Sequence, residues 1–577
     1  MADLRSATTR ALPGGYSFAV ASVIFGPLFG PGYLLLRDAV STPRSYLTDS
    51  ALGLGDAAPR AVPQDAALAV ASSVLDGGIV VKLILFAALW LSGWGAAVLV
   101  RSVLSGVAVG PQLVAATVVM WNPYVAERLL QGHWSLLVGY AALPWTAKAA
   151  IELRSGSGVR AWCALAVCLG AAGLTPTGAL LAIVVAVVLV RPKQLIGVGA
   201  MAVVTSAPWL YAAIASGAGA MTSDPAGVAA FAARAEPGLA TFGSLAGLGG
   251  IWNSAAVPTS RTSGFAFVGT GILLGVVAIG LPYLWRRGRD RAVFALACTA
   301  IGALLFATVA ATPLGISAGE WLVVEVPGAG LLRDTQKWIA LVVPLYALAA
   351  AAGCQAIVAR FATPEQPNPA RFLTPAASIL LLLVALPDLV WGVGGALRPV
   401  RYPVSWERVA ESIDTDLPGA VAVVPDGMFR AFPYTGRAPV LDPAPRMLPR
   451  DVLQSGELIV ARGRVDGEGS RAAEVERLLA AGAPVSELAA KGVGWILVER
   501  TAVGRAGKPD VSIDGLEQLY ADDELALYRV PGVAAEGEKP RGAALFAHAM
   551  WSALLAGGIL GSVFCIVIRV RRRPDES

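Results

Sequence analysis

Long apolar runs recur along this chain, and most of them are long enough to cross a lipid bilayer as a helix. A membrane-spanning helix needs about 20 predominantly apolar residues. By length and apolarity we expect about twelve spans, near residues 16–36, 78–100, 103–121, 135–150, 161–174, 177–190, 194–216, 265–285, 292–312, 338–359, 372–395 and 542–568. Only 15% of the residues are charged, against roughly 25% in globular proteins. The sequence therefore predicts a polytopic α-helical membrane protein with about 12 transmembrane helices.

Short basic segments alternate with longer mixed loops, and this alternation predicts how the chain is oriented. Short loops rich in Arg and Lys stay in the cytoplasm, and residues 286–291 and 569–573 have this character. We therefore expect a multi-pass plasma-membrane protein with both termini in the cytoplasm and its long loops outside. The net charge of +5 does not indicate nucleic acid as a partner. All five cysteines fall in apolar spans, where they are typical of small core residues.

The long outer segment 396–541 combines strand and helix patterns. Strands are predicted near 421–425, 493–499 and 525–530, and a helix over 471–482 that ends at a glycine. This order favours a small extracytoplasmic α/β domain. The expected organisation is a transmembrane domain over 1–395 with an outer loop at 37–77, the α/β domain over 396–541, and a last helix with a basic tail over 542–577.

The first span is expected to leave the membrane at Arg37 and Asp38, where a polar loop begins. The loop closes with residues 62–71, which carry Asp65 and have the pattern of a short amphipathic helix at the interface. A carboxylate at this position would give a reacting hydroxyl a fixed base beside the lipid headgroups. Arg37 and Asp65 are candidates for substrate binding. The alternative is that Arg37 and Asp38 form an interfacial ion pair that only anchors the span.

A second polar stretch, residues 121–134, is expected at the outer end of the third span. Trp and Tyr near its ends are typical of the headgroup belt, and an Asn-Pro pair stops the preceding helix. Glu127, Arg128, Gln131 and His133 follow at near-helical spacing, so their side chains can converge on one face. This spacing predicts a substrate-binding surface that includes Glu127, Arg128 and His133. The alternative is an inert interfacial turn in which His133 is merely hydrogen-bonded.

A third polar stretch, residues 327–338, precedes the tenth span and carries Arg333, Asp334 and Lys337. Cations on the outer face oppose the positive-inside trend, and an anionic phosphate at headgroup level would explain them. Arg offers a planar fork and Lys a point charge to such a phosphate. The alternative is a local Arg333–Asp334 pair with a snorkelling Lys337.

Together these features resemble the glycosyltransferase C superfamily, whose members are membrane enzymes that use polyprenyl-phosphate sugars. The shared features are an acidic residue at the outer end of the first span, a long first outer loop, many spans and a terminal outer domain. The stretches Asn-Pro-Tyr…Glu-Arg-Leu-Leu-Gln-Gly-His-Trp and Leu-Leu-Arg-Asp-Thr-Gln-Lys-Trp look like those of actinobacterial members. The chain has neither an Asp-Asp pair in its first loop nor a Trp-Trp-Asp signature. No cofactor is therefore certain, and a divalent cation is left open.

The resemblance implies an inverting transfer on the outer face, from a polyprenyl-phosphate sugar donor to a glycan, lipid or protein acceptor of the cell envelope. Asp38 would be the general base that accepts the proton of the acceptor hydroxyl. Arg333 and Lys337, with Arg128 or His133, would hold the leaving phosphate. The α/β domain would hold the acceptor, and membrane lipids are expected partners.

Two other functions remain open from the sequence. Twelve spans with both termini inside are also a common carrier topology, so a transporter or flippase of envelope lipids or glycans is one alternative. Carriers, however, place their polar residues at the membrane midplane on broken helices, and this chain has few there. The other alternative is a non-catalytic envelope assembly protein whose outer domain binds a partner.

Overall fold

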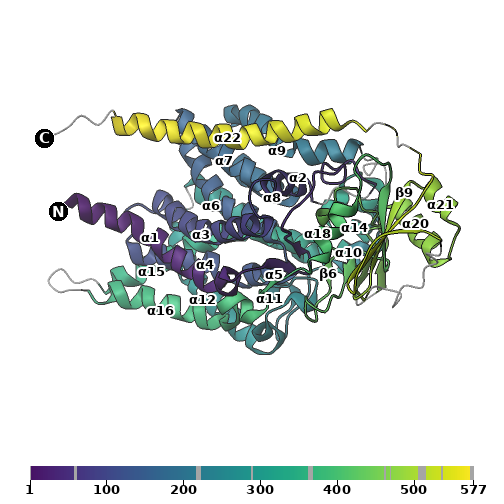
Figure 1. The fold of residues 1–577 in the computed structure, drawn as a ribbon. Helices are drawn as coiled ribbons and strands as arrows, with labels where there is room; N and C mark the ends of the chain where they lie inside the picture. Colours follow the sequence, from purple (N-terminus) through teal and green to yellow (C-terminus); the bar gives the residue numbers. More distant parts are fainter. Residues whose placement is uncertain are drawn as a thin grey trace.

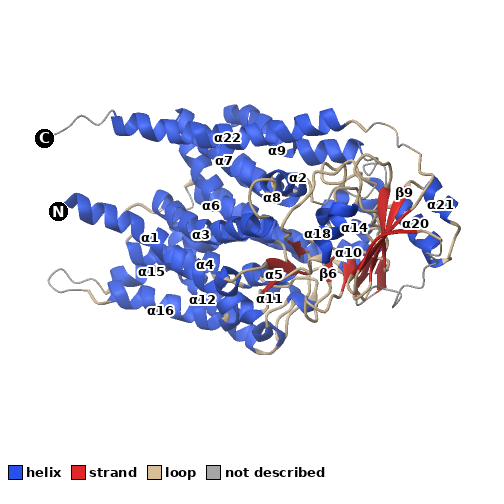
Figure 2. Cartoon of the chain, in the orientation of Figure 1, coloured by secondary structure: helices blue, strands red, loops and turns tan. Residues whose placement is uncertain are grey.

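The computed structural model describes residues 2–56, 61–156, 158–215, 223–287, 290–361, 368–460, 463–467, 469–503, 515–534, 537 and 539–571. A bundle of helices occupies one end of the molecule, and the longer strands gather at the other end (Figures 1 and 2). The first turn of α1 (Ala2–Phe25) and the last turn of α22 (Arg541–Arg571) lie at the same end of the bundle, away from the strands (Figure 1).

Seven helical segments in the described part of the chain are long and apolar enough to cross a membrane. They are Ala11–Phe29, Gly77–Val103, Pro192–Ala215, Phe265–Arg286, Arg291–Ala310, Thr335–Arg360 and Arg541–Ile568. An eighth would be the pair Ala370–Ala385 and Pro387–Gly395, which is bent by 83°. The chain is thus a multi-pass membrane protein, but the expected count of about twelve spans is not confirmed.

The remaining bundle helices explain this difference in the count. They are α4 (Val109–Met120), α6 (Trp134–Ser155), α7 (Gly158–Ala172) and α8 (Pro176–Leu189). At 1.5 Å per residue, α4, α7 and α8 are roughly 18–23 Å long, shorter than the ~30 Å hydrocarbon core. The longer α6 ends in the charged residues Lys148, Glu152 and Arg154.

The first span ends earlier than its apolar run predicts. The helix α1 passes into a 3₁₀ turn, η1 (Gly26–Phe29), and residues Tyr33–Leu36 form strand β1 instead of helix. Two prolines and three glycines lie between residues 26 and 32, and both residue types interrupt helices. The expected span over 16–36 is therefore wrong in its last third.

Strand β1 forms a small three-stranded sheet at the edge of the bundle. It pairs with β2 (Ala39–Val40) and with β3 (Pro399–Val400), in the order β2-β1-β3. Leu36 lies opposite Ala39 in the antiparallel register, so Arg37 and Asp38 form the two-residue tip of a hairpin. Asp38 is thus held by strand pairing rather than by the end of a transmembrane helix.

The strand-rich segment contains a four-stranded sheet in the order β10-β11-β9-β4. Strands β4 (Ala420–Val424) and β9 (Val493–Glu499) are parallel, and β11 (Leu525–Arg529) and β10 (Glu517–Ala521) continue antiparallel. Strands β4, β9 and β11 and the helix α20 (Ser470–Ala480) confirm the predicted elements within two residues at each end, whereas β10 was not predicted. Hydrophobic side chains pack on both faces, with Trp406 of α18 (Ser405–Ser412) on one and Val475 of α20 on the other.

The described chain also contains further helices, some of which form the spans above, and two hairpins. The helices are α2 (Gln64–Ala71), α5 (Pro123–Gln131), α9 (Leu195–Ala215), α10 (Ala226–Ala230), α11 (Thr241–Ala246), α12 (Phe265–Arg286), α13 (Arg291–Ala310), α14 (Pro313–Glu325), α15 (Val343–Arg360), α19 (Ala444–Met447) and α21 (Val485–Ala490). The helix α2 confirms the short helix predicted near the end of the loop 37–77, and its place at the membrane interface stays a prediction. Two small hairpins, β5 (Phe429–Arg430) with β6 (Val440–Leu441) and β7 (Leu458–Val460) with β8 (Gly463–Val465), flank the larger sheet.

The strand-rich segment is bonded directly to the hairpin that carries Asp38. The backbone N–H of Leu441 donates to the carbonyl of Arg37 at 2.8 Å. Arg446 donates to the carbonyl of Val40 at 3.0 Å and to the carboxylate of Asp65 at 2.9 Å. Strand pairing, a backbone bond and an ion pair together hold the tip of the hairpin in place.

Candidate functional site

The helix α5 is a short element whose ends are both capped. The Asn122 side chain accepts the backbone N–H of Val125 at 3.1 Å, and Pro123 occupies the first helical position. Gly132 ends the helix in the left-handed conformation, with φ = 86°. These are preferred start and stop residues of helices, so the sequence defines α5 locally.

The position of α5 differs from the sequence-based expectation. Every residue of α5 is buried, and the flanking Trp121 and Trp134 are 4% and 2% exposed. Tyr124 is fully buried and stacks on Tyr140 at 5.3 Å. These aromatic residues therefore pack within the protein rather than against lipid headgroups, and their depth in the membrane stays a prediction.

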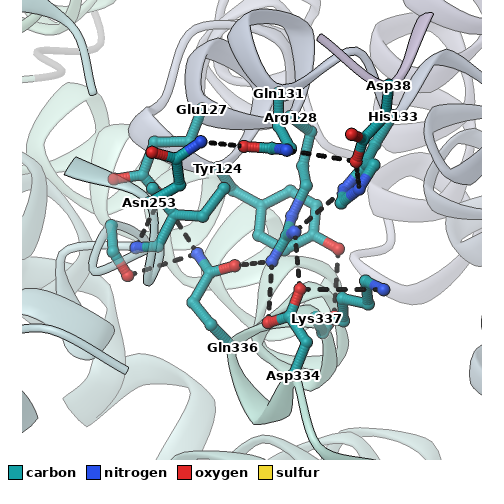
Figure 3. A network of polar contacts seen from close by, with 12 residues as sticks. Asp38, Tyr124, Glu127, Arg128, Gln131, His133, Asn253, Asp334, Gln336 and Lys337 are labelled. Carbon is teal, nitrogen blue, oxygen red and sulfur yellow. Dashed lines mark hydrogen bonds and ion pairs between the residues drawn. The ribbon is translucent and has the colours of Figure 1, made fainter. Parts of the chain in front are cut away.

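The carboxylate of Asp38 is held on one of its two oxygens. Its Oδ2 accepts hydrogen bonds from Gln131 Nε2 at 3.1 Å and from His133 Nε2 at 3.0 Å (Figure 3). The backbone N–H of Asp38 donates to the carbonyl of Gln131 at 3.1 Å. Within the described residues Oδ1 accepts no hydrogen bond, and the side chain is 28% exposed. Asp38 thus presents one free carboxylate oxygen from a fixed backbone.

The tautomer of His133 follows from its two neighbours. Arg128 Nη1 lies 3.0 Å from Nδ1 of the imidazole, and an arginine can only donate. Nδ1 is therefore the acceptor, and Nε2 carries the hydrogen that it donates to Asp38. Burial lowers the pKa of His133; the hydrogen bond to Asp38 opposes this, but the charges of Lys337 and Arg128 lower it further. The imidazole is neutral at pH 7.

Asp38 is ionised at neutral pH. Burial alone would raise the pKa of Asp38, but hydrogen bonds from His133 and Gln131 and the charge of Lys337 outweigh it. The net effect is a pKa below the usual value of an aspartate. The carboxylate can therefore accept a proton through Oδ1 without first losing one.

Arg128 is the fully buried centre of the cluster. Its guanidinium donates to Asp334 at 3.0 Å, to Gln336 and to His133, and it lies over the Tyr124 ring at 5.2 Å. These contacts occupy both terminal nitrogens of the guanidinium, and within the described residues its buried Nε has no hydrogen-bond partner. Because Arg128 has no exposed surface, its role in this geometry is to connect the three polar stretches.

Glu127 belongs to the same cluster through Gln336 and also holds a second loop. Its two oxygens accept the backbone N–H groups of Gly250 at 3.1 Å and Ile251 at 3.2 Å, and Gln336 also donates to it. Burial and the charge of Glu236 raise the pKa of Glu127 to about 8. Glu127 therefore fixes residues 249–251 against α5.

Lys337 is the accessible cation of this cluster. Its Nζ lies 3.7 Å from Asp334 Oδ2, which is long for a hydrogen bond, and its side chain is 25% exposed. Its charge acts on both Asp38 and His133. Lys337 can thus turn toward an anion without breaking a tight contact.

Three residues predicted for the site lie outside the cluster. Arg37, with φ = 48°, donates to the carbonyls of Leu130 at 2.6 Å and of Ala255. Asp65 is paired with Arg446, and Arg333 donates to the carbonyl of Gly330 at 3.2 Å while it covers the Phe231 ring at 5.6 Å. The structure thus brings together Asp38, Glu127, Arg128, His133, Asp334 and Lys337, but not Arg37, Asp65 or Arg333.

Sequence reasoning missed three members of the cluster. Asn253 donates to Gln131 at 2.8 Å, Gln336 bridges Arg128 and Glu127, and the Tyr124 hydroxyl donates to the carbonyl of Lys337 at 3.0 Å. Gln336 and Tyr124 lie inside stretches that the sequence singled out. Asn253 stands in a long loop without any motif, so no local signal marks it.

The contact between Gly132 and the hairpin gives a direct test of this geometry. A Cβ at Gly132 would lie 2.3 Å from the Ala39 nitrogen and 2.5 Å from the Leu36 oxygen. We expect Gly132→Ala to push the hairpin off α5 and to lower the melting temperature of the purified protein by several degrees. Gly156→Ala is the matched control, because Gly156 has φ = 97° but open space around it. If both variants lowered the melting temperature equally, the loss would come from the left-handed backbone conformation alone, and the predicted contact between Gly132 and the hairpin would be contradicted.

The residues of the cluster do not form a metal site. In the parts of the chain that the structure describes, no three His, Cys, Asp or Glu side chains gather as metal ligands.

The fold and the cluster define a polytopic membrane protein with a polar site where the helical bundle meets the β1–β2 hairpin. No protein-family model and no curated protein matches the sequence. Among solved structures, the fold is similar to that of arabinofuranosyltransferase AftD from mycobacteria, determined by cryo-EM, with a TM-score of 0.53 and 16% identity. The match covers 91% of this chain but 42% of that one, so the chain spans less than half the length of AftD. At this identity the similarity establishes the fold.

Proposed function

We propose that this protein is a membrane glycosyltransferase that moves a sugar from a polyprenyl-phosphate donor to a hydroxyl of a cell-envelope acceptor. The observation that carries the proposal is Asp38, an ionised carboxylate with one oxygen fixed by Gln131 and neutral His133 and the other free. The similarity of the fold to AftD, an arabinofuranosyltransferase by name, supports the same class of reaction.

The proposed reaction is a single displacement at the anomeric carbon of the donor sugar. The acceptor oxygen attacks this carbon while its proton passes to Oδ1 of Asp38. The bond from the anomeric carbon to the phosphate oxygen breaks, and polyprenyl phosphate leaves with the electron pair. A single displacement of this kind inverts the configuration of the sugar.

The other members of the cluster have supporting roles in this proposal. Lys337 pairs with the phosphate and stabilises the charge that develops on it as it leaves. His133 and Gln131 are positioning residues for Asp38, and Arg128 holds His133 in the tautomer that can donate to Asp38. Glu127 holds the loop at Gly250, and Asp334 holds the guanidinium of Arg128.

The proposed site lies on the outer face of the plasma membrane, with both termini in the cytoplasm. The basic short loops support this orientation, and so does the common location of the first and last helical turns (Figure 1). The strand-rich segment 396–541 would form an extracytoplasmic domain that holds the acceptor, since it contacts the Asp38 hairpin through Leu441 and Arg446.

An assay with purified protein in nanodiscs tests the proposal. The protein is incubated with a panel of decaprenyl-phosphate sugars and envelope glycans, and released decaprenyl phosphate is measured together with the glycosylated product. We expect stoichiometric release and product for one donor class. Movement of the lipid across the bilayer without cleavage would instead identify a flippase, and intact donor without movement would favour an assembly protein.

A further inference from the structure

Aromatic side chains of α1 and α3 (Gly77–Val103) form a continuous ladder along two adjacent membrane spans. Successive ring centroids lie 4.9 to 5.7 Å apart, in edge-to-face and stacked geometries. In order from the hairpin end inward, the aromatic ladder consists of Phe29, Phe25, Phe86, Phe18, Trp90 and Trp94. The helices that carry it lie side by side in the bundle (Figure 1).

The ladder passes through the apolar interior of the bilayer rather than along its surface. Trp94 lies 17 residues into α3, or roughly 26 Å from its start at 1.5 Å per residue, against a hydrocarbon core of ~30 Å. Trp and Tyr of membrane proteins usually collect at the two interfaces. Anchoring at an interface could account for Trp94 near the far end of α3, but not for the phenylalanine rings that lie between the two ends of the ladder.

Every ring of the ladder except Phe25, which is 3% exposed, has surface that an apolar ligand can reach. Phe29 is 62% exposed and Phe18 is 48% exposed, while Phe86, Trp90 and Trp94 are partly exposed. The indole N–H of Trp90 donates to the carbonyl of Gly14 at 2.9 Å, so the polar atom of this ring is satisfied inside the protein. The ladder thus presents ring faces and edges to the surrounding hydrocarbon.

A lysine lies at the Phe29 end of the ladder, and the chain leads from this end to the proposed site. Lys82 stands one helical turn from Phe86 toward the start of α3, and its Nζ donates to the carbonyl of Gly30 at 2.7 Å. Phe29 is the last residue of η1, and β1 follows four residues later and leads to Asp38. A cation therefore marks the headgroup end of the ladder, and the chain connects that end directly to the hairpin.

We propose that the aromatic ladder is the docking track for the isoprenoid chain of an anionic polyprenyl lipid, with the lipid head at the Lys82 end. The repeated double bonds of such a chain offer flat, polarisable groups and C–H edges to the rings along its whole length, which saturated acyl chains lack. The proposal rests on the proposed function, because the lipid would be the sugar donor or the polyprenyl phosphate that the transfer releases.

Photolabelling tests the track without requiring sugar transfer. The probe is decaprenyl phosphate with a diazirine on its terminal isoprene unit, added to the full-length protein in phospholipid nanodiscs. We expect labelled peptides from residues 11–29 and 77–103, and competition by unlabelled decaprenyl phosphate. The double variant Phe18→Leu with Trp90→Leu removes two rings but keeps apolar side chains, and it should reduce this labelling by about five-fold or more.

A matched control is available on other spans. Trp285→Leu with Phe294→Leu removes two rings that are 86% and 61% exposed on α12 and α13, and labelling of α1 and α3 should stay unchanged. Equal labelling of α12, α13 and the ladder helices, or full labelling of the ladder variant, would overturn the track. Intact ladder labelling in a protein that transfers no sugar would retain the track and overturn the proposed function.

Discussion

Asp38→Asn is expected to reduce sugar transfer by roughly 10²- to 10⁴-fold, the usual contribution of a general base. Asparagine has nearly the same shape, and its carbonyl oxygen can still accept the hydrogen bonds from Gln131 and His133 that Oδ2 accepts now. What the variant loses is the free basic oxygen. Membrane insertion, the melting temperature and donor binding should therefore change little, while release of decaprenyl phosphate in nanodiscs falls close to background.

Two other acids of the first outer loop are matched controls for this experiment. Asp56 pairs with Arg471 at 3.2 Å and is 38% exposed, and Asp65 pairs with Arg446 at 2.9 Å. An exposed ion pair such as that of Asp56 contributes about 0–1 kcal/mol, so Asp56→Asn should retain most of the rate. The pair of Asp65 with Arg446 is largely buried, so Asp65→Asn should lower stability and cost some rate, but far less than Asp38→Asn. If Asp38→Asn keeps more than about a tenth of the rate and Asp65→Asn abolishes it, the base is Asp65 and the cluster around Asp38 is structural.

Local sequence signals predicted those parts of the fold that depend on neighbours in the chain. The spacing of Glu127, Arg128, Gln131 and His133 correctly indicated a helical turn with converging polar groups, because capping residues fix α5 on both sides. The strands β4, β9 and β11 were likewise visible as runs of β-branched and aliphatic residues between turn residues.

Contacts between distant residues could not be predicted in this way. Arg128 and Asp334 are 206 positions apart, and Asn253 reaches Gln131 from a loop 122 positions away. Nothing local in the sequence shows that Arg128 is fully buried rather than exposed to lipid headgroups. The position of Arg333 could not be predicted for the same reason, because its cation–π partner Phe231 lies in a distant loop.

The end of the first span was predicted wrongly for a different reason. Hydropathy alone cannot separate a helix from a buried strand when both are apolar, so residues 33–36 were counted in the first span. The glycines and prolines between residues 26 and 32 were the available signal of a break. The consequence for function is large, since a hairpin tip bonded to α5 places Asp38 more rigidly than a fraying helix end would.

Lys337→Gln is expected to reduce kcat/KM for the lipid-linked donor by roughly ten- to a hundred-fold, because it removes one charge-assisted contact to the phosphate. The variant should also change the pH dependence. The charge of Lys337 helps to keep the pKa of Asp38 low, so its removal raises that pKa. Because the base must be ionised, the acidic limb of the kcat/KM profile should move to higher pH, and activity should be lost sooner as the pH falls.

Arg333→Gln tests whether the effect belongs to Lys337 or follows from the loss of any nearby cation. Arg333 contacts Gly330 and Phe231 rather than Asp334 or Asp38 in the contacts that define the cluster, so the acidic limb should stay where it is in wild type. A profile of Lys337→Gln that coincides with wild type would remove Lys337 from the neighbourhood of the base. If Arg333→Gln lowered kcat/KM for the donor more than Lys337→Gln did, Arg333 would be the residue that binds the phosphate. The proposed position of the phosphate would then move toward α10.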